Sequence, residues 1–387
     1  MTGCVNTMSG SAPITINPLP VAFTMTGGGS YCSGGTGVSI GLSSSNVGVS
    51  YQLYNGTATV GAPVTGTGAP LSFGMHTAAG NYTVRGTNTS TTCWNTMSGS
   101  AIIVVNTLPT AYTVTGGGNY CPGGAGVVVG LSGSNAANTY QLYRGITAIG
   151  SPVPGSGSAI SFGLQTAAGT YTVIATNAAT LCRRTMTGSA TISINPLPVV
   201  QIITGGGSFC SGGAGVPVGL SGSVSGILYQ LYNGGTPVGS PMVGTGGAIS
   251  FGLKTVPGVY TATATNTVTA CSSNMSGSAT IVINPLPPLN NVTGGGSYCA
   301  GGAGLSVGLD GSVVGVTYQV YNGTISSGVS MPGTGLPLDF GIRTTAGTYT
   351  IIATDDFTGC TSTMTGSAVV TVDPLPEIGR ASCRERV

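Results

Sequence analysis

The stretch Thr26-Gly27-Gly28-Gly29-Ser30-Tyr31-Cys32-Ser33-Gly34-Gly35-Thr36-Gly37 decides the organisation of this chain. Close copies of it recur, and their cysteines are Cys32, Cys121, Cys210 and Cys299. The spacing stays at 89 residues (121 − 32 = 89; 299 − 210 = 89). A fixed period of this length is typical of a tandem array in which one small domain is repeated.

The expected repeat boundaries fall at proline motifs. Pro18-Leu19-Pro20 recurs with the same period, once as Thr107-Leu108-Pro109. Proline fixes φ and restrains the residue before it, so each motif predicts a short, stiff joint. We expect the tail of a preceding repeat at 1–20, Ig-like repeats at 21–109, 110–198, 199–287 and 288–376, and a tail at 377–387 that resembles a translated sequencing adapter.

Each repeat is expected to contain seven short strands. Val38, Ile40 and Leu42 alternate with small residues, which is the period of a half-buried strand. The motif Tyr-Gln-Leu-Tyr at 51–54 ends at Asn55-Gly56, a strong hairpin signal. The remaining strands are expected at 23–25, ending at the triple glycine, in the Gly/Pro-rich segment after 56, at 71–73, at 82–84 and, in the second repeat, at 190–194. No stretch has a helical period, so the chain is predicted to be all-β, with two-sheet sandwiches.

Composition excludes several classes of function. Charged residues make up 4% of the chain, the formal net charge is +2, and no Asp or Glu precedes Asp310. We therefore expect no nucleic-acid partner. The apolar runs, such as 101–105, are strand-sized, so no membrane span is expected. Despite 69 glycines, the regular period and weak charge argue against disorder.

Few residues could carry out chemistry. The single histidine, His76, has no equivalent in the other repeats and is expected to be a loop residue. Asp355-Asp356 is expected to be a solvated turn, because a calcium site needs several clustered oxygens. The Gly123–Gly126 loop has no helix or Lys-Ser/Thr after it, as a phosphate loop would. We expect no enzyme, no cofactor and no metal site.

Exposed aromatic residues suggest a different kind of site. An aromatic residue precedes the first cysteine of each repeat, in what we expect to be a flexible loop: Tyr31, Tyr120, Phe209 and Tyr298. These rings could stack on sugars, although packing across the joint to the next repeat is the favoured interpretation. Trp94 occurs once and supports no repeated role. Asn-X-Ser/Thr triplets, among them those at Asn55 and Asn88, leave glycosylation open.

The ten cysteines indicate an oxidising compartment and disulfides. All but Cys383, in the tail at 377–387, recur in register, with no Cys-X-X-Cys motif and no histidine partner, so a zinc site is not expected. Two sets of pairs remain open. Pairing within repeats would join residues 61 apart: Cys32–Cys93, Cys121–Cys182, Cys210–Cys271 and Cys299–Cys360. Pairing between repeats would join residues 150 apart: Cys32–Cys182, Cys121–Cys271 and Cys210–Cys360.

Topology favours pairing between repeats. The first cysteine precedes the second strand and the second cysteine follows the sixth, so they should lie at opposite ends of one sandwich. A strand of six residues spans roughly 20 Å, whereas a disulfide needs Cα atoms within about 7 Å. The last strand leads the chain toward the next repeat, where the loop between the sixth and seventh strands carries the second cysteine. Cys4, Cys93 and Cys299 would then need partners in repeats outside this sequence or in another chain.

The whole repeat pattern resembles a known class of protein. Its parts are PLP, GGGxYC, GGxGVxVGL, YQLY, SFG, AAGTYTVxATN, a cysteine and MSGSAxIxINPLP, and it covers residues 2–376. It is similar to the Ig-like repeats of very large cell-surface proteins of Bacteroidetes-type bacteria, including adhesins. The resemblance implies a tandem array of seven-stranded Ig-like (Greek-key) β-sandwich domains, export to the cell surface, and an export signal and anchor outside this fragment.

The expected function is structural. The repeats would form an extracellular stalk or filament, and the alternative is an adhesin whose repeats bind glycans or partner cells. Expected partners are neighbouring repeats and further copies of the chain, because sheet edges without Lys are poorly protected against pairing.

Overall fold

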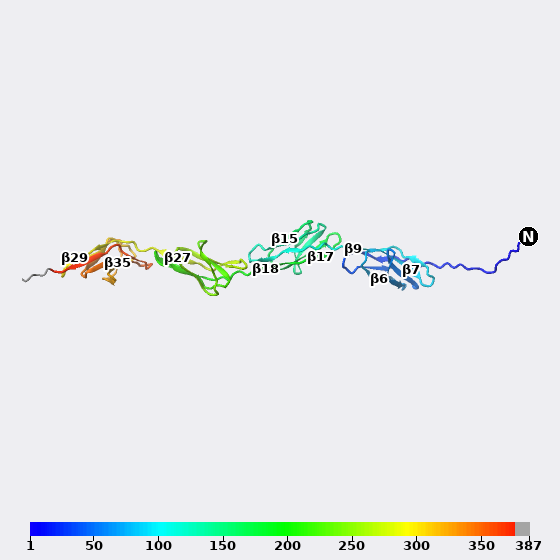
Figure 1. The fold of residues 1–387 in the computed structure, drawn as a ribbon, viewed down its shortest axis with the longest axis horizontal. Coiled ribbons are helices and arrows are strands. Elements are labelled where there is room, and N and C mark those ends of the chain that lie inside the picture. Colours follow the sequence, from blue (N-terminus) through cyan, green and yellow to red (C-terminus); the bar gives the residue numbers. More distant parts are fainter. Residues whose placement is uncertain (376–387) are drawn as a thin grey trace, which may run out of the picture. The chain divides into compact units, whose positions relative to one another are not determined.

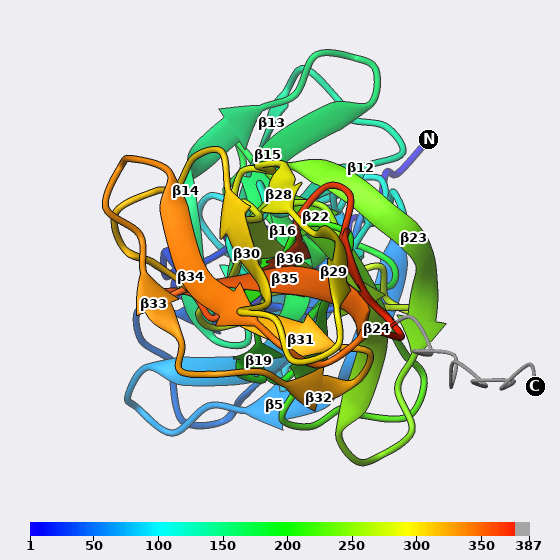
Figure 2. The ribbon, with the colours of Figure 1, turned by 90° about the vertical axis from the view of Figure 1, so that its left-hand side faces the viewer.

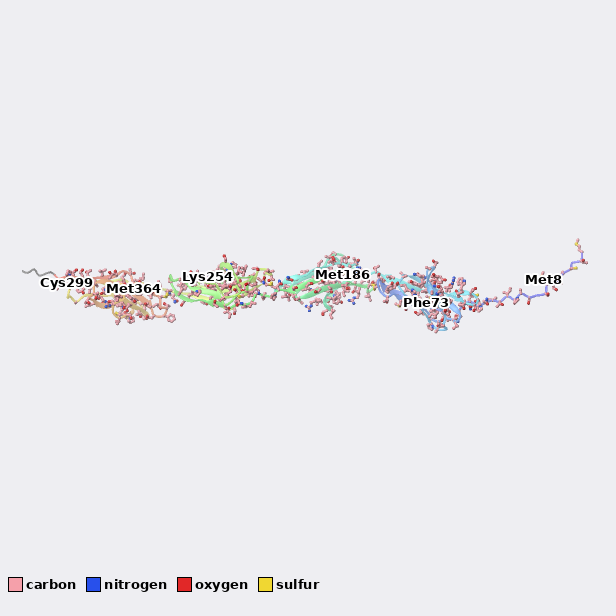
Figure 3. All side chains as sticks on the ribbon, turned by 60° about the horizontal axis from the view of Figure 1, so that its bottom comes forward. Met8, Phe73, Met186, Lys254, Cys299 and Met364 are labelled. Carbon is pink, nitrogen blue, oxygen red and sulfur yellow. A yellow bond between two sulfur atoms is a disulfide. The ribbon has the colours of Figure 1, made fainter. Side chains whose placement is uncertain are left out.

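The computed structural model describes residues 1–375, so the adapter-like tail expected at 377–387 lies outside the described residues. The described residues form β-strands joined by turns, with no helix (Figure 1). The chain divides into two compact units, Met1–Asn195 and Pro196–Val387. Residues 1–20 have no regular secondary structure, and Met8 lies on this extended segment (Figure 3).

The first unit contains the first two repeats. The strands of the first repeat are β1 (Met25–Gly27), β2 (Gly29–Cys32), β3 (Val38–Leu42), β4 (Val49–Asn55), β5 (Ala58–Thr65), β6 (Leu71–His76), β7 (Gly80–Asn88), β8 (Trp94–Thr96) and β9 (Ala101–Asn106). Those of the second repeat are β10 (Val114–Gly116), β11 (Gly118–Tyr120), β12 (Val127–Leu131), β13 (Asn138–Arg144), β14 (Thr147–Pro154), β15 (Ile160–Gln165), β16 (Gly169–Asn177), β17 (Arg183–Thr185) and β18 (Ala190–Ile194).

The second unit contains the last two repeats. The strands of the third repeat are β19 (Ile203–Gly205), β20 (Gly207–Cys210), β21 (Val216–Leu220), β22 (Ile227–Asn233), β23 (Thr236–Val243), β24 (Ile249–Lys254), β25 (Gly258–Asn266), β26 (Ser272–Asn274) and β27 (Ala279–Asn284). Those of the fourth are β28 (Val292–Gly294), β29 (Gly296–Cys299), β30 (Leu305–Leu309), β31 (Val316–Asn322), β32 (Ile325–Ser326), β33 (Met331–Pro332), β34 (Leu338–Arg343), β35 (Gly347–Asp355), β36 (Thr361–Thr363) and β37 (Ala368–Asp373).

Every repeat has the same two sheets. In the first repeat, one sheet has the order β1-β3-β6, and the other has the order β2-β9-β7-β4-β5, with β8 paired to β7. All pairs are antiparallel except β2 with β9, which is parallel. This is an Ig-like sandwich in which the first strand is shared between the sheets. The predicted all-β, tandem Ig-like fold is confirmed, and β8 is an additional short strand.

The first strand, β1, ends at Gly27 in the triple glycine, as expected from the sequence, but a second strand follows directly. The chain crosses there from one sheet to the other: β1 pairs with β3, and β2 pairs with β9. Gly27 has φ 87°, and a Cβ at this position would lie 2.0 Å from the carbonyl oxygen of Ser39. Only glycine fits such a close approach with positive φ. The stretch that carries Cys32, predicted to be a flexible loop, is therefore a strand.

A separate core fills each sandwich, and each core is drawn from a single predicted repeat. Two fully buried tyrosines dominate the first core, Tyr51 and Tyr82. The Tyr51 hydroxyl accepts a hydrogen bond from the amide of Asn46 at 2.9 Å. The Tyr82 hydroxyl donates to the carbonyl of Ala78 at 2.9 Å, which is the tyrosine corner of Greek-key sandwiches. The core is thus apolar, with both phenol groups satisfied.

The edge strand β5 is protected against pairing. The β4–β5 ladder shifts register between Tyr51 and Leu53, and the amide of Gln52 fills the irregularity by donating to the carbonyl of Val60 at 3.1 Å. Pro63 lies within β5. In the fourth repeat the same edge is broken into β32 and β33 (Figure 2). Proline and a bulge protect an edge without any lysine, so the expectation of unprotected edges does not hold here.

Candidate functional site

The notable chemical feature of the chain is its set of cysteine pairs. In the first unit, Cys32 is bonded to Cys182 with a Cα–Cα distance of 5.6 Å, and in the second unit Cys210 is bonded to Cys360 at 5.5 Å. Each bond joins the first cysteine of one repeat to the second cysteine of the next, 150 residues away. Cys121 and Cys271 are also disulfide-bonded, and the Cys121–Cys271 pair stays a prediction.

The pairs within repeats are not formed at either end of the described chain. Cys93 and Cys299 both have free thiols, which leaves no Cys32–Cys93 or Cys299–Cys360 bond. Cys4 is also free and exposed. Cys93 is half-buried, with its sulfur 4.0 Å from the carbonyl oxygen of Asn17.

Strand β2 explains where the first cysteine lies. Because β2 runs parallel to β9, Cys32 lies opposite Asn106, the last residue of β9. The amide of Ser33 extends the pairing by donating to the Asn106 carbonyl at 2.8 Å. Cys32 therefore lies at the end of the sandwich from which the chain leaves for the next repeat.

The second cysteine is held by a tight turn between β16 and β17. The side-chain oxygen of Asn177 accepts hydrogen bonds from the amides of Ala179 and Thr180, both at 3.0 Å. The Asn177 amide donates to the carbonyl of Cys182 at 2.9 Å, which closes the turn. Leu181, just before the cysteine, has φ 60°. Cys182 is fully buried, so this turn fixes the sulfur in one position.

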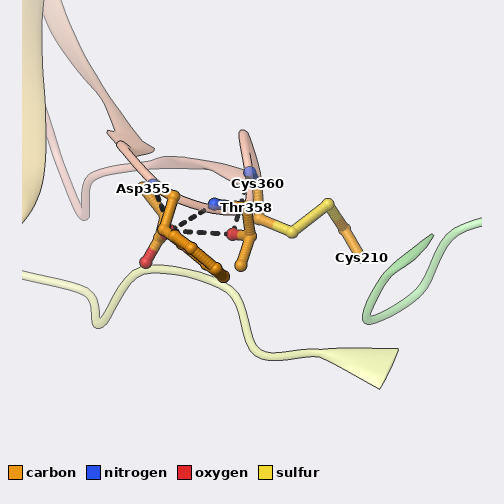
Figure 4. The surroundings of a disulfide bond; sticks show 5 residues. Cys210, Asp355, Thr358 and Cys360 are labelled. Carbon is orange, nitrogen blue, oxygen red and sulfur yellow. Dashed lines mark hydrogen bonds between the residues drawn. A yellow bond between two sulfur atoms is a disulfide. The ribbon is translucent and has the colours of Figure 1, made fainter. Parts of the chain in front are cut away.

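The fourth repeat builds the same turn from different residues (Figure 4). Asp355 replaces the asparagine, and its Oδ1 accepts from the amide of Thr358 at 2.7 Å, the Thr358 hydroxyl at 2.9 Å and the amide of Phe357 at 3.1 Å. These hydrogen bonds, those from Thr358 first, lower the pKa of Asp355. Gly359, with φ 70°, takes the position of Leu181.

Hydrogen bonds to the proline motif complete the connection between repeats. The guanidinium of Arg184, on β17, donates to the carbonyl of Pro109 at 3.2 Å. In the first repeat, Asn95 on β8 donates in the same way to Pro20 at 2.8 Å. The strand that follows the second cysteine thus also holds the preceding linker.

The other residues that were considered for chemistry make hydrogen bonds within turns and strands. His76 ends β6, with Nε2 3.0 Å from the carbonyl oxygen of Phe73. The carboxylate of Asp355 accepts a hydrogen bond from the Thr358 amide within the turn, and that of Asp356 accepts one from the Thr317 hydroxyl at 2.7 Å. In the Gly123–Gly126 loop, Gly124 donates to the Cys121 carbonyl, which makes a simple turn. Within residues 1–375, no group of three or more His, Cys, Asp or Glu could hold a metal ion.

The aromatic residues before the first cysteines are not loop residues. Tyr31 lies on β2, half-buried against the core of its own repeat, and its hydroxyl donates to the carbonyl of Thr77. Tyr120, Phe209 and Tyr298 pack in the same way. Both the sugar-stacking and the across-the-joint interpretations are therefore wrong for these rings, because β2 pairs with its own sandwich.

Two aromatic residues of the described chain are exposed to solvent: Phe357, in the turn after β35, and Trp94. Trp94 on β8 is 54% exposed, and the guanidinium of Arg85 lies 5.1 Å from its ring centroid and 5.7 Å from that of Tyr54. The corresponding positions in later repeats are Arg183, Ser272 and Thr361. This group belongs to the first repeat alone and is not a repeated binding surface.

Comparisons with known proteins concern the fold class only. No family model and no curated protein matches the chain. Among solved structures, Sidekick-1 immunoglobulin domains 1–5 match with TM-score 0.26 and 13% identity, over 92% of this chain and 79% of that one. The mouse nectin-like molecule 4 ectodomain matches with TM-score 0.31 and 13% identity, over 66% and 96%. At these values the likeness gives no information on function.

The described strands themselves identify the architecture. The chain is a tandem array of Ig-like β-sandwich repeats. Its described part contains no helix long and apolar enough to span a membrane.

Proposed function

We propose that this chain is part of an extracellular repeat protein of the bacterial cell surface, where it acts as a stalk or filament. The observation that supports this best is the disulfide between successive repeats, as in Cys32–Cys182. Such bonds persist in oxidising compartments and add a second covalent connection to the proline linker. The small number of charged groups fits a mechanical role, since general acid–base chemistry needs titratable side chains.

Two measurements test this proposal. Brief protease treatment of intact cells that express the full protein should release peptides from these repeats. The cysteines at the paired positions in these peptides should not react with an alkylating agent until a reductant is added. Peptide mapping without reductant should find Cys32 linked to Cys182 and Cys121 linked to Cys271. Peptides recovered only after lysis, with free thiols at these positions, would overturn the extracellular assignment.

Assembly with further copies belongs to the same proposal. In each repeat β6 or its equivalent is an edge strand, and it exposes an apolar side chain at the same register: Met75, Leu164, Leu253 and Ile342 are all more than half exposed. Pairing along this edge would place one of these apolar side chains at the same register in every repeat. Light scattering of the full chain at rising concentration tests it, and a strict monomer throughout would count against lateral assembly.

The adhesin alternative has one supporting observation, the exposed Trp94 beside Arg85. Aromatic rings of this kind can stack on sugars. Glycan-array binding that is lost in Trp94→Ala would favour an adhesin. Binding that persists in that variant would require another site, and no binding would leave the structural role.

A further inference from the structure

The disulfides give this array a route for tension that does not follow the chain. This inference rests on the proposed stalk function and concerns how a stalk would carry force. We propose that tension passes from repeat to repeat through Cys32–Cys182 and Cys210–Cys360, so that most of each sandwich lies outside the stretched path and the array is nearly inextensible.

The path follows from the covalent connections. Tension entering at the N-terminal end reaches Cys32 through β1 and β2, then crosses the disulfide to Cys182. It continues along the chain through β17, β18, β19 and β20 to Cys210, and crosses the second disulfide to Cys360. Among the strands of residues 1–375, only β36 and β37 follow. A pulled polymer is limited by its shortest covalent path, which here is this one.

The bypassed segments contain most of the strands. Residues 33–181 hold β3 to β16, and residues 211–359 hold β21 to β35. Each segment is closed by a bond that keeps its ends 5.6 Å or 5.5 Å apart between Cα atoms. Unfolding of a bypassed core therefore adds no length. Its ends stay together, so the entropic cost of closing that loop is already met when it refolds.

The geometry of each end suits this role. Cys32 is the last residue of β2, directly opposite the end of β9, so disulfide and linker leave the sandwich side by side. In the second repeat, Cys182 is fully buried in its turn. Two residues later, the guanidinium of Arg184 donates a hydrogen bond to the carbonyl of Pro109 in the linker. The two covalent connections are thus anchored on neighbouring elements at both ends.

A single-molecule stretching experiment on the full chain tests this proposal. Handles are joined to the two termini by a chemistry that spares thiols, and the force is raised until every non-covalent contact is broken. The chain contributes roughly 3.5 Å per extended residue, so the proposed path of about 86 residues should stop at about 300 Å. Adding a reductant should let the same molecule reach about 1,350 Å, an increase of more than fourfold.

Other connectivities stop at different lengths. Pairing within repeats leaves a path of about 142 residues, which ends at about 500 Å. A stop near 500 Å, or an oxidised chain that reaches about 1,350 Å, would overturn the proposal. Neither result bears on whether cells display the repeats, which protease treatment of intact cells measures separately.

A matched pair of variants isolates the disulfide. Cys182→Ser should at least double the limiting length, to about 700 Å or more, because tension can then no longer cross at Cys32 and must follow the chain through the whole first repeat before it reaches another disulfide. Cys93→Ser removes the equivalent cysteine of the first repeat, whose thiol is free, and should leave the limit at about 300 Å. Because lengths are read after unfolding, the result holds even where a variant folds poorly. Equal lengths for the two variants would refute the path.

Discussion

The second and fourth repeats present their second cysteine from the same turn, but they stabilise it differently. The second repeat uses Asn177 and holds Leu181 at φ 60°, whereas the fourth uses Asp355 and has Gly359 at φ 70°. The backbone is shared although the residues differ. The disulfide position therefore depends on the backbone of the turn, and each repeat meets its demands at a different energetic cost and with a different response to pH.

The crossing glycine is a position where the two repeats should respond alike. Gly116 and Gly294 have φ 89° and 91°, and a Cβ would lie 2.0 Å from the carbonyl oxygen of Val128 or Ser306. We expect Gly116→Ala and Gly294→Ala to destabilise their own repeats by about 2–4 kcal/mol, since strain and a backbone clash add together. Hydrogen exchange resolved by peptide measures it.

The control for this pair is Gly145→Ala, in a turn where nothing lies within 4 Å of the added Cβ. Because Gly145 has φ 58°, Gly145→Ala should lose only the free energy of placing a non-glycine residue in the left-handed region, about 1–2 kcal/mol. Equal protection losses in Gly116→Ala and Gly145→Ala would show that the close approach of Gly116 to the backbone of β12 is unimportant.

The sequence was sufficient to predict much of the fold. Strand periodicity located the strand at Val38–Leu42 to the residue, and the Asn55-Gly56 signal lies at the expected hairpin. The sequence could not show that the chain crosses between sheets at Gly27. A run of glycines reads the same in a sequence whether it ends a strand or lets the chain cross to another sheet with positive φ. For the same reason the sequence predicts Tyr31 in a loop, whereas it lies on β2.

Some structural roles do have a recurring signal in the sequence. The spacing Ala78-Ala79-Gly80-Asn81-Tyr82 recurs in related form in every repeat, and it marks the tyrosine corner. Gln52 in the Tyr-Gln-Leu-Tyr motif marks the irregularity between β4 and β5. The positive φ of Leu181 had no signal within its own repeat, and only the glycine at the equivalent position, Gly359, hints at it. Comparing repeats with each other would have found it.

Exchanging the turn residues should separate the two repeats. Leu181 is 72% exposed, so Leu181→Gly loses little burial and removes the strain of a left-handed leucine. We expect it to stabilise the second repeat by about 1 kcal/mol, and Gly359→Leu to destabilise the fourth by about 1–2 kcal/mol. Repeat-resolved hydrogen exchange reports both. If Leu181→Gly instead destabilised its repeat, the contacts of the Leu181 side chain would contribute more free energy than its left-handed backbone costs.

The smallest expected effect is on the response to acid, and it distinguishes the carboxylate of the fourth repeat from the amide of the second. Asp355 accepts its hydrogen bonds only in the folded state, so its pKa there lies below the value of about 3.9 typical of an unfolded chain. Above about pH 3.9 both states are ionised and the full contribution is present. As the pH falls further, the unfolded state binds its proton first, so stability is lost toward the lower folded pKa.

Digestion by pepsin between pH 4 and 2 should therefore cut the fourth repeat before the second in the same chain. Asp339, whose pKa is lowered first by the Ser306 hydroxyl, and Asp310, whose pKa is lowered first by the side chain of Asn291, act in the same direction, so Asp355→Asn should reduce this difference rather than abolish it. The reciprocal Asn177→Asp should make the second repeat more sensitive to acid. The turn would be ruled out as a source of acid sensitivity if both exchanges left the order and the pH of cleavage unchanged, because the carboxylate would then contribute the same free energy in both states.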